Sequence, residues 1–453
     1  MITRRRLLAN SILASLSGLA PKSLLADSSA GTLVPWRNWS GALSSNPKVR
    51  LTPASEDELV SMIKTSSGVI RPVGAGHSFT PLVPTNSNLL VLDKLSGLIS
   101  HDVNSRQATL WAGTRISNTG PALDAIGQAM INLPDIDRQT LAGAIATSTH
   151  GTGKNLKSMS GYVTGLRLVT PTGEVLDIDE ATDPDLFNAA RVSFGSLGVI
   201  TRVTFQNREP FRLRTRTWVE ETESVLEKFD DSVNQYEHFE MMPLLHSKYS
   251  LVISNEETND ALQASTEEDD GGEFLSLLEA TPVMLRAALI NTLAADIEPV
   301  ETVSKSFDGL TNLRFDRFNE MEYSVPVEAG PHCLREILSI VEQESIDVVI
   351  PLEYRIIGGD DTWLGMFSGG PRVSISVHRL AAFDYRPYFD RVEPIFWKYD
   401  GRPHWGKVHS LAYSELKNLY PRFDDFVALQ ASIDPQGRML NDHLKQLLGR
   451  QGK

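Results

Sequence analysis

The sequence predicts an α+β fold built in two parts that divide near residue 210. Before that point short helical patterns mix with strand-like apolar runs, and beyond Phe211 alternating strand patterns take over. The length of 453 residues is enough for two or three domains with substantial cores. Hydrophobic residues make up 41% of the chain and charged residues 22%, as in an ordinary soluble protein.

The first part begins with a helix and continues with short strands. Ser55 and Glu58 have the spacing of a capping box, and the apolar residues of 59–63 recur at helical spacing. Strand-like runs follow at Val69-Ile70, Leu89-Leu90-Val91-Leu92 and Ala108-Thr109-Leu110-Trp111-Ala112. The runs 163–169 and 175–178, joined by the turn Pro171-Thr172-Gly173, predict a hairpin.

The second part carries the longer alternating patterns. Arg212, Arg214 and Arg216 alternate with less polar residues and predict a strand, and 373–378 alternates in the same way. The apolar run 280–295 predicts a helix, and Val348-Val349-Ile350 predicts a strand leading into Glu353. Between 255 and 273 the chain has eight acidic residues and no basic ones, which we interpret as a solvated loop. The alternative of a calcium site lacks the Gly and Glu placement of an EF-hand.

Charge and cysteine content exclude several classes of function. The formal net charge is −14, and an acidic surface of this size repels nucleic acid and anionic lipid. It favours a neutral or small substrate. The single Cys333 excludes an intramolecular disulfide framework. The ten histidines are scattered without metal-ligand spacing, so the sequence predicts no metal site.

The first thirty residues have the layout of an export signal. Arg4-Arg5-Arg6 precedes an uncharged, mildly apolar stretch that runs to Ala20, and Ala26 or Ala30 offers a cleavage point. The arginine pair predicts the twin-arginine route, and with it a periplasmic or secreted location. A disordered basic tail or a short anchor is the alternative, although the apolar stretch is short for a membrane span.

The most informative string is Arg71-Pro72-Val73-Gly74-Ala75-Gly76-His77-Ser78-Phe79, a glycine-rich turn after a strand. Gly74 and Gly76 allow the sharp turn that brings backbone N–H groups close to a phosphate. The string is not the Rossmann fingerprint, because Phe79 stands where a third glycine would be needed. A lone histidine in a turn is usually an ordinary surface residue, so His77 gains meaning only from a second motif.

That second motif is Gln139-Thr140-Leu141-Ala142-Gly143-Ala144-Ile145-Ala146-Thr147-Ser148-Thr149-His150-Gly151-Thr152-Gly153. Small residues and hydroxyls alternate here with glycines, which suits a backbone lying flat against a ligand. A loop packed tightly for steric reasons is the alternative for this string alone. Together with the first motif, it predicts a ligand-binding site built from two segments.

Taken together, the two motifs resemble the vanillyl-alcohol-oxidase-type (PCMH) flavoproteins. The similarity is to the aldonolactone and alditol oxidase branch, which includes D-arabinono-1,4-lactone and L-gulonolactone oxidases. It continues in order through Leu186-Phe187-Asn188-Ala189-Ala190-Arg191, Gly195-Ser196-Leu197-Gly198-Val199-Ile200-Thr201, Met321-Glu322-Tyr323-Ser324-Val325-Pro326, Glu353-Tyr354-Arg355 and Arg402-Pro403-His404-Trp405-Gly406-Lys407.

The resemblance implies a two-part FAD-binding domain over 31–210 and an α+β substrate or cap domain with a mainly antiparallel sheet over 211–400. It implies that 401–453 returns to the flavin. In this family the histidine of the first motif is bonded to the 8α-methyl of FAD, so His77 is expected to hold the flavin covalently. The expected cofactor contacts are Val73, Gly74, Ala75, Gly76, His77, Ser78, Phe79, Pro134, Asp135, Thr140, Gly143, Ala144, Ile145, Ala146, Ser148, His150, Gly151, Gly198, Val199, Ile200 and Lys407.

Four ionisable residues are the expected catalytic set. Glu353 and Arg355 are two apart, so on a strand both face one side. A cross-strand salt bridge is the ordinary interpretation of such a pair. In alditol oxidases the matching Glu, Arg, His and Lys face the flavin and bind substrate hydroxyls, which extends the hypothesis to His378 and Lys407. We expect His378 or Lys407 to take the hydroxyl proton, with Lys407 alternatively stabilising charge on the reduced ring.

The choice of electron acceptor is predicted from Pro134. At the matching position the family has Gly or Pro in oxidases and often Ala in dehydrogenases, so Pro134 favours O2 as acceptor. Two residues depart from the family pattern: Asp135 replaces a common Ser, and Leu380 replaces a Thr of the alditol oxidases. Because of these two departures, the sequence does not predict which polyol is the substrate.

The sequence therefore predicts an FAD-dependent oxidase of a sugar-derived CH–OH group, either an aldonolactone or an alditol, that reduces O2 to H2O2. A flavin dehydrogenase serving a periplasmic carrier is the second hypothesis. A non-catalytic flavin or ligand-binding protein is the third. The expected partners are a small sugar-derived substrate, O2 and the twin-arginine export machinery, with neither nucleic acid nor a membrane span in the mature chain.

Overall fold

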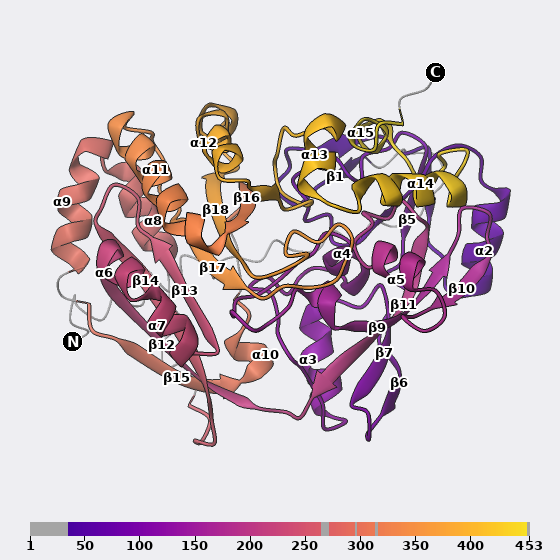
Figure 1. Cartoon of the computed structure of the whole chain (residues 1–453), viewed down its shortest axis with the longest axis horizontal. Helices are drawn as coiled ribbons and strands as arrows, with labels where there is room; N and C mark the ends of the chain where they lie inside the picture. Colours follow the sequence, from indigo (N-terminus) through magenta and orange to yellow (C-terminus); the bar gives the residue numbers. More distant parts are fainter. Residues whose placement is uncertain (1–34, 264–270, 295–296, 313–315, 451–453) are drawn as a thin grey trace.

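The computed structural model describes residues 35–263, 271–294, 297–312 and 316–450. The chain forms two lobes side by side, one from the N-terminal half and one from the following two hundred residues (Figure 1). The twin-arginine signal predicted for residues 1–30 lies outside the described residues. Within the described ranges, none of the helices combines the length and the apolar character that a membrane span requires.

The first lobe starts with a three-stranded parallel sheet in the order β3-β5-β4. Its elements are β3 (Val49–Leu51), α2 (Glu56–Thr65), β4 (Ile70–Val73) and β5 (Asn88–Val91), preceded by the short pair β1 (Trp36–Arg37) and β2 (Ser44–Ser45). The predicted helix cap is confirmed, because the Ser55 hydroxyl accepts a hydrogen bond from the Glu58 N–H at 3.1 Å. The strand β4 delivers the chain directly into the glycine-rich turn.

A second sheet of the first lobe is antiparallel, in the order β10-β9-β11-β7-β6. The strands are β6 (Leu98–Asp102), β7 (Gln107–Trp111), β8 (Ala129–Met130), β9 (Val163–Val169), β10 (Val175–Ile178) and β11 (Val199–Arg208), with the helices α3 (Ile116–Asp124), α4 (Leu141–Ile145) and α5 (Pro184–Ala190). The predicted hairpin is confirmed as the antiparallel pair β9–β10. Buried residues alternate along β11, as a strand with one face in the core requires.

The second lobe is built on a larger antiparallel sheet, with the strand order β15-β12-β14-β13-β17-β18-β16-β19 in the described part of the chain. The strands are β12 (Arg212–Glu221), β13 (His238–Pro243), β14 (Tyr249–Thr258), β15 (Val300–Lys305), β16 (Phe318–Pro326), β17 (Glu353–Ile357), β18 (Arg372–Leu380) and β19 (Arg402–Pro403). The helices are α6 (Thr222–Glu227), α7 (Phe229–Gln235), α8 (Gly271–Ala280), α9 (Val283–Ala294), α10 (Ser306–Gly309), α11 (Gly330–Gln343) and α12 (Arg386–Lys398). Helices α6, α7, α11 and α12 contribute to one core with the sheet. The predicted α+β class is confirmed.

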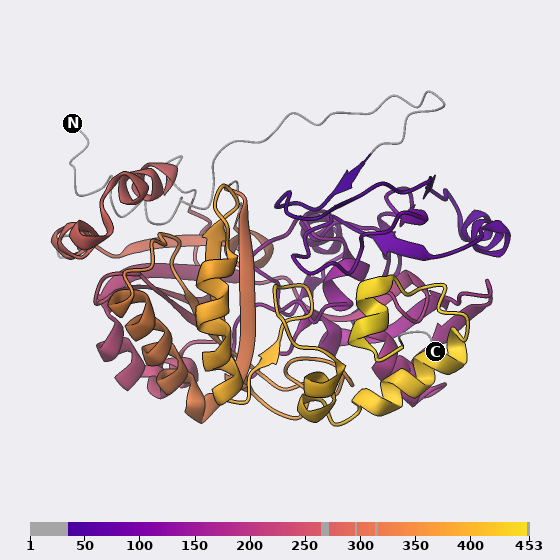
Figure 2. The same cartoon turned by 90° about the horizontal axis from the view of Figure 1, so that it is seen from above.

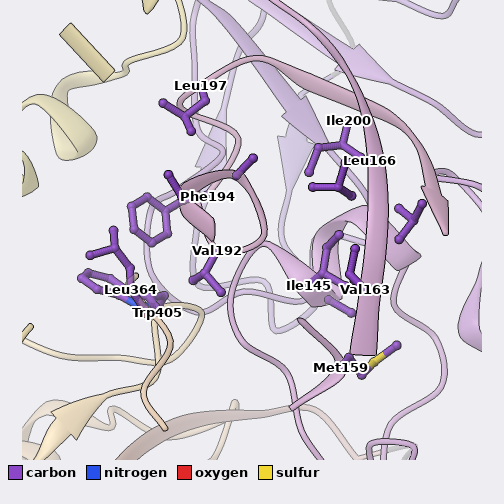
Figure 3. Packing of buried hydrophobic residues seen from close by; sticks show 14 of the residues in the cluster. Ile145, Met159, Val163, Leu166, Val192, Phe194, Leu197, Ile200, Leu364 and Trp405 are labelled. Carbon is purple, nitrogen blue, oxygen red and sulfur yellow. The ribbon is translucent and has the colours of Figure 1, made fainter. Parts of the chain in front are cut away.

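The last fifty residues return to the first lobe. After β19 the helices α13 (Tyr413–Leu419), α14 (Phe423–Ile433) and α15 (Asp442–Leu447) lie over that lobe, drawn in yellow in Figures 1 and 2. Trp405 and Leu364, both distant in sequence, pack against Val192 and Phe194 in its core (Figure 3). The buried Arg71 guanidinium donates to the carbonyl oxygens of Gly195 at 3.0 Å and of Met439. These contacts tie the end of the chain to the strand before the glycine-rich turn.

Three expectations about local structure are wrong or incomplete. Val348-Val349-Ile350 is not a strand; Pro351 follows this run, and β17 begins only at Glu353. The helix predicted over 280–295 is confirmed as α9, but it begins only at Val283, because Ala280 ends α8 and the Pro282 ring prevents one continuous helix. The acidic stretch is only partly a loop, because β14 extends to Thr258 and α8 begins at Gly271. Residues 264–270 of that stretch lie outside the described residues.

Candidate active site

Two cavities meet where the lobes join. The first has a volume of about 1060 Å³ and lies against the glycine-rich turn and α4. The second, of about 940 Å³, lies against the large sheet of the second lobe. Gln139, His404 and Lys407 line both cavities, so the two adjoin at these residues. The arrangement has room for a long ligand with a smaller molecule at one end.

Backbone and small side chains line the first cavity. The predicted cofactor contacts that line this cavity are Val73, Gly74, Ala75, Gly76, His77, Ser78, Thr140, Gly143, Ala146, Gly198, Val199, Ile200 and Lys407. Further glycines, Gly113, Gly195 and Gly406, extend the lining. Gly76 has φ +68°, a conformation that L side chains rarely adopt, and it turns the chain toward His77. The cavity therefore offers close approach to backbone N–H groups along its length.

The two motifs contact each other at Gly74 and Thr140. The Thr140 hydroxyl caps α4 by accepting from the Gly143 N–H at 3.3 Å. A Cβ at position 74 would lie 2.1 Å from that hydroxyl oxygen, so only glycine fits beside the cap.

Gly74→Ala is expected to lower the free energy of unfolding by about 1–3 kcal/mol, because the new methyl displaces the Thr140 side chain. Thr140→Ala alone is expected to cost about 1 kcal/mol through loss of the cap. The double variant should be more stable than the sum predicts, since removing the hydroxyl makes space for the methyl. Chemical denaturation of the holoenzyme measures this coupling, and strictly additive losses would refute the steric explanation.

His77 lies in the first cavity with a neutral ring. It stacks on Trp39 with ring centroids 4.3 Å apart. Burial, together with the nearby Lys407 ammonium, lowers the pKa of His77 to about 4. The ring therefore carries a nitrogen lone pair at neutral pH, as a nucleophilic imidazole must.

A carboxylate, a lysine and a histidine form the first cluster of the second cavity. Glu320 on β16 is ion-paired with Lys407, and its other oxygen lies 3.7 Å from His378 Nε2. Burial by itself would raise the pKa of the Glu320 carboxyl, but the Lys407 ammonium and the His378 ring hold it well below its usual range. His378 Nδ1 lies 3.1 Å from the Pro351 carbonyl oxygen, which can only accept, so Nδ1 carries the proton. In the neutral ring Nε2 is then free to accept a proton.

A second cluster surrounds Glu322, two residues along the same strand. His150 Nε2 lies 2.7 Å from Glu322 Oε1, the Ser374 hydroxyl donates to the same oxygen, and Lys407 Nζ is 3.9 Å from Oε2. Burial by itself would raise the pKa of Glu322, but His150 holds it well below the usual range. Burial lowers the pKa of His404 to about 3. His404 Nδ1 accepts from the Gly406 N–H at 3.0 Å, so the neutral ring carries its proton on Nε2.

Glu353 and Arg355 face the second cavity from one side of β17, as expected from their spacing. They form an ion pair with each other, and Arg355 Nε also lies 3.1 Å from Glu240 Oε2. Ion pairs therefore hold Glu353 and Arg355 in place on the lining of the cavity. The structure brings the four predicted catalytic residues to the lining of one cavity, namely Glu353, Arg355, His378 and Lys407.

The remaining predicted cofactor residues lie elsewhere. Pro134, Asp135 and His150 line the second cavity and not the first. Phe79, Ala144, Ile145, Ser148 and Gly151 are on the lining of neither. Ala144 and Ile145 are on the core face of α4, and Phe79 packs against Trp39 and Phe318. Helical periodicity explains the first two, because successive residues of α4 cannot all face a ligand.

The second cavity contains four further residues for which the sequence predicted no role, namely Glu320, Glu322, His404 and Gln139. One signal was available: Glu320 and Glu322 are spaced i, i+2 inside the otherwise weakly charged run of β16, and charged residues are rarely buried without a partner. Their partners come from distant segments that only the fold brings together.

Among the described residues, two groups have the spacing to hold a metal ion, namely His150, Glu322 and His404, and Glu320, Glu353 and His378. Lys407 is already ion-paired with both Glu320 and Glu322. The Lys407 ammonium thus neutralises carboxylate charge that a metal ion would otherwise neutralise. The absence of a metal site stays a prediction.

The comparisons with known proteins agree with this geometry. A family model described as FAD binding domain matches residues 47–179, the segment that contains both glycine-rich motifs. The cavity beside these motifs fits that cofactor, because it has a volume of about 1060 Å³ and is lined by glycines together with His77, His404 and Lys407. The fold and the site thus define an FAD-dependent oxidoreductase. A second model, described as D-arabinono-1,4-lactone oxidase, matches residues 203–447, and the chain belongs to this family.

Full-length relatives have related names. The chain is 32% identical to an L-gulono-1,4-lactone dehydrogenase of Mycobacterium tuberculosis, over 91% of this chain and 99% of the relative. It is 27% identical to the L-gulonolactone oxidase of Mus musculus and to an alditol oxidase of a Streptomyces species, in each case over 91% of this chain and 98% of the relative. A solvent-stable cholesterol oxidase superposes with a TM-score of 0.76 at 16% identity, over 92% of this chain and 97% of that chain, which shows the shared fold.

Proposed function

We propose that this protein oxidises a secondary or primary CH–OH group of a neutral sugar derivative, an aldonolactone or an alditol, with O2 as the electron acceptor. The observation that carries the proposal is that Lys407 and His404 line both cavities. A cofactor bound in the first cavity would then have one end beside the carboxylates and histidines of the second. When bound, FAD supplies the hydride acceptor and the two-electron transfer to O2 that gives H2O2.

The protein residues orient the substrate and move one proton. Glu353 and Arg355 offer an acceptor and a donor for substrate hydroxyls or lactone oxygens on the same strand face. The substrate hydroxyl proton passes to His378 Nε2, and the Glu320 carboxylate 3.7 Å away stabilises the imidazolium that results. Lys407, paired with two carboxylates at the junction, stabilises negative charge that develops next to it.

We further propose that FAD is attached covalently through His77. The ring nitrogen is neutral, stacked on Trp39 and placed on the cavity wall, which supports nucleophilic attachment. We also propose export by the twin-arginine route, which carries folded proteins and so suits a chain that acquires its cofactor in the cytoplasm. Support for export comes from Arg4-Arg5 and the small residues up to Ala30.

A direct test is to mix the purified holoenzyme anaerobically with aldonolactones and alditols and to follow bleaching of the flavin. Bleaching is expected with at least one neutral lactone or alditol. Admitting air should then return the flavin colour with about one H2O2 formed per substrate oxidised. If no lactone or alditol bleaches the flavin, the proposed function is wrong.

The acceptor has a specific alternative, because the Mycobacterium tuberculosis relative is named a dehydrogenase. Pro134 lines the second cavity and supports the oxidase. Reoxidation by an artificial carrier that is much faster than reoxidation by air, with little peroxide, would favour the dehydrogenase.

A further inference from the structure

A further hollow adjoins the second cavity. We call the second cavity the substrate cavity, because the proposed substrate binds there. The further hollow has a volume of about 530 Å³ and lies between the lobes, against β12, β13 and β14. Asp135 and Arg355 line both this hollow, which we name the rear chamber, and the substrate cavity. The two spaces therefore adjoin at these side chains.

Arg355 reaches both sides of this wall. Its guanidinium is paired with Glu353, which lines the substrate cavity, and with Glu240, which lines the rear chamber. Burial by itself would lower the pKa of Arg355, but Glu240 and Asp135 raise it above the ordinary value. The side chain is therefore a fixed cation that a ligand on either side can contact.

Asp135 is held in place from the rear chamber. Asn312 donates from its backbone N–H to the Asp135 carbonyl oxygen at 2.7 Å and from its side-chain amide to Asp135 Oδ1 at 2.7 Å. Asn312 belongs to the segment after α10 in the second lobe, whereas Asp135 belongs to the first. The two-point contact fixes the carboxylate at the boundary of the two spaces.

The chamber lining has the chemistry that recognises hydroxyl groups. Thr215 and Thr217 from β12 and Asn255 from β14 face it together with Glu240 and Asn312. The Thr215 hydroxyl donates to Asn255 Oδ1 at 2.6 Å. Thr217 is only 5% exposed, and it lines the chamber. A hydroxyl on the lining of a polar cavity can bond to water or to a ligand there.

We propose that the rear chamber is a distal subsite for the far hydroxyls of an extended, neutral polyhydroxylated substrate, reached past Asp135 and Arg355. This inference rests on the proposed function, because it extends the same substrate cavity. The reacting CH–OH lies at His378 and Lys407, and the additional carbon or glycosyl unit lies beyond Arg355. The enzyme is thereby selective for substrates longer than a six-carbon lactone or alditol.

The test compares matched short and extended substrates. The pairs are L-gulono-1,4-lactone with a heptono-1,4-lactone, and sorbitol with its glucosylated form maltitol. Wild-type enzyme is expected to show a higher kcat/KM for the extended member of at least one pair. Thr217→Val removes the hydroxyl at nearly constant shape and is expected to lower kcat/KM about 3- to 10-fold for that extended substrate, with the short one changed less than twofold. Thr217→Ser keeps the hydroxyl and should retain the wild-type ratio.

The outcomes are distinguishable. If no lactone or alditol of the bleaching screen, these four compounds included, reduces the flavin, the proposed function itself fails. If short substrates are oxidised but extended ones are rejected, or if Thr217→Val lowers kcat/KM equally for both members or for neither, the distal subsite is refuted. Flavin content and thermal unfolding of each variant are measured alongside, so that a general loss of folded enzyme is recognised as an equal loss on both members.

Discussion

Lys407→Met is expected to lower the rate constant of anaerobic flavin reduction by about 10³-fold or more. The substitution keeps a side chain of similar length but removes the ammonium that is paired with Glu320 and lies 3.9 Å from Glu322. Two buried carboxylates then lose their common cation at the point where the two cavities meet. Stopped-flow spectroscopy with the substrate identified in the bleaching screen measures the effect.

Two further variants separate charge at the site from general damage. Lys407→Arg keeps a cation beside Glu320 and is expected to recover part of the rate. Lys417→Met removes an exposed lysine of α13 and should leave the rate unchanged. If Lys407→Met binds flavin normally and is reduced at the wild-type rate, the role given to Lys407 is wrong.

His77→Ala is expected to abolish covalent retention of the flavin. After acid precipitation of the wild-type enzyme the yellow colour should stay with the pellet, whereas in the variant it should pass to the supernatant. The physical reason is that a ring with a pKa of about 4 is almost entirely neutral at pH 7 and lies on the cavity wall.

The matched control is His101→Ala, which removes an exposed histidine of β6 and should leave the colour in the pellet. Retention of colour by His77→Ala would show that another residue carries the flavin or that precipitation traps it. Complete release from the wild-type enzyme would show that FAD is held without a covalent bond.

The strength of the sequence prediction depended on how local each signal was. The capped helix α2, the β9–β10 hairpin and the same-face pair Glu353 and Arg355 follow from short-range patterns, and the structure contains all three. The predicted strand at 348–350 is absent. Apolar runs of three residues do not distinguish a strand from a buried connection.

The candidate site divides in the same way. His77 and Lys407 belong to distinctive strings, so the sequence identified them, and the structure places both on the first cavity. Glu320 and Glu322 were not identified, because their importance comes from Lys407, His378 and His150 on three other segments. Pairings between distant segments depend on strand register and on the packing of the lobes, neither of which a local pattern encodes.

The contacts of the last fifty residues determine when the protein can mature. His404, Gly406 and Lys407 form part of the first cavity, and Arg71, just before the glycine-rich turn, bonds to the Met439 carbonyl. The lining of the first cavity is therefore complete only after almost the entire chain has been synthesised. A fragment ending at the boundary between the lobes would therefore lack part of the lining of this cavity.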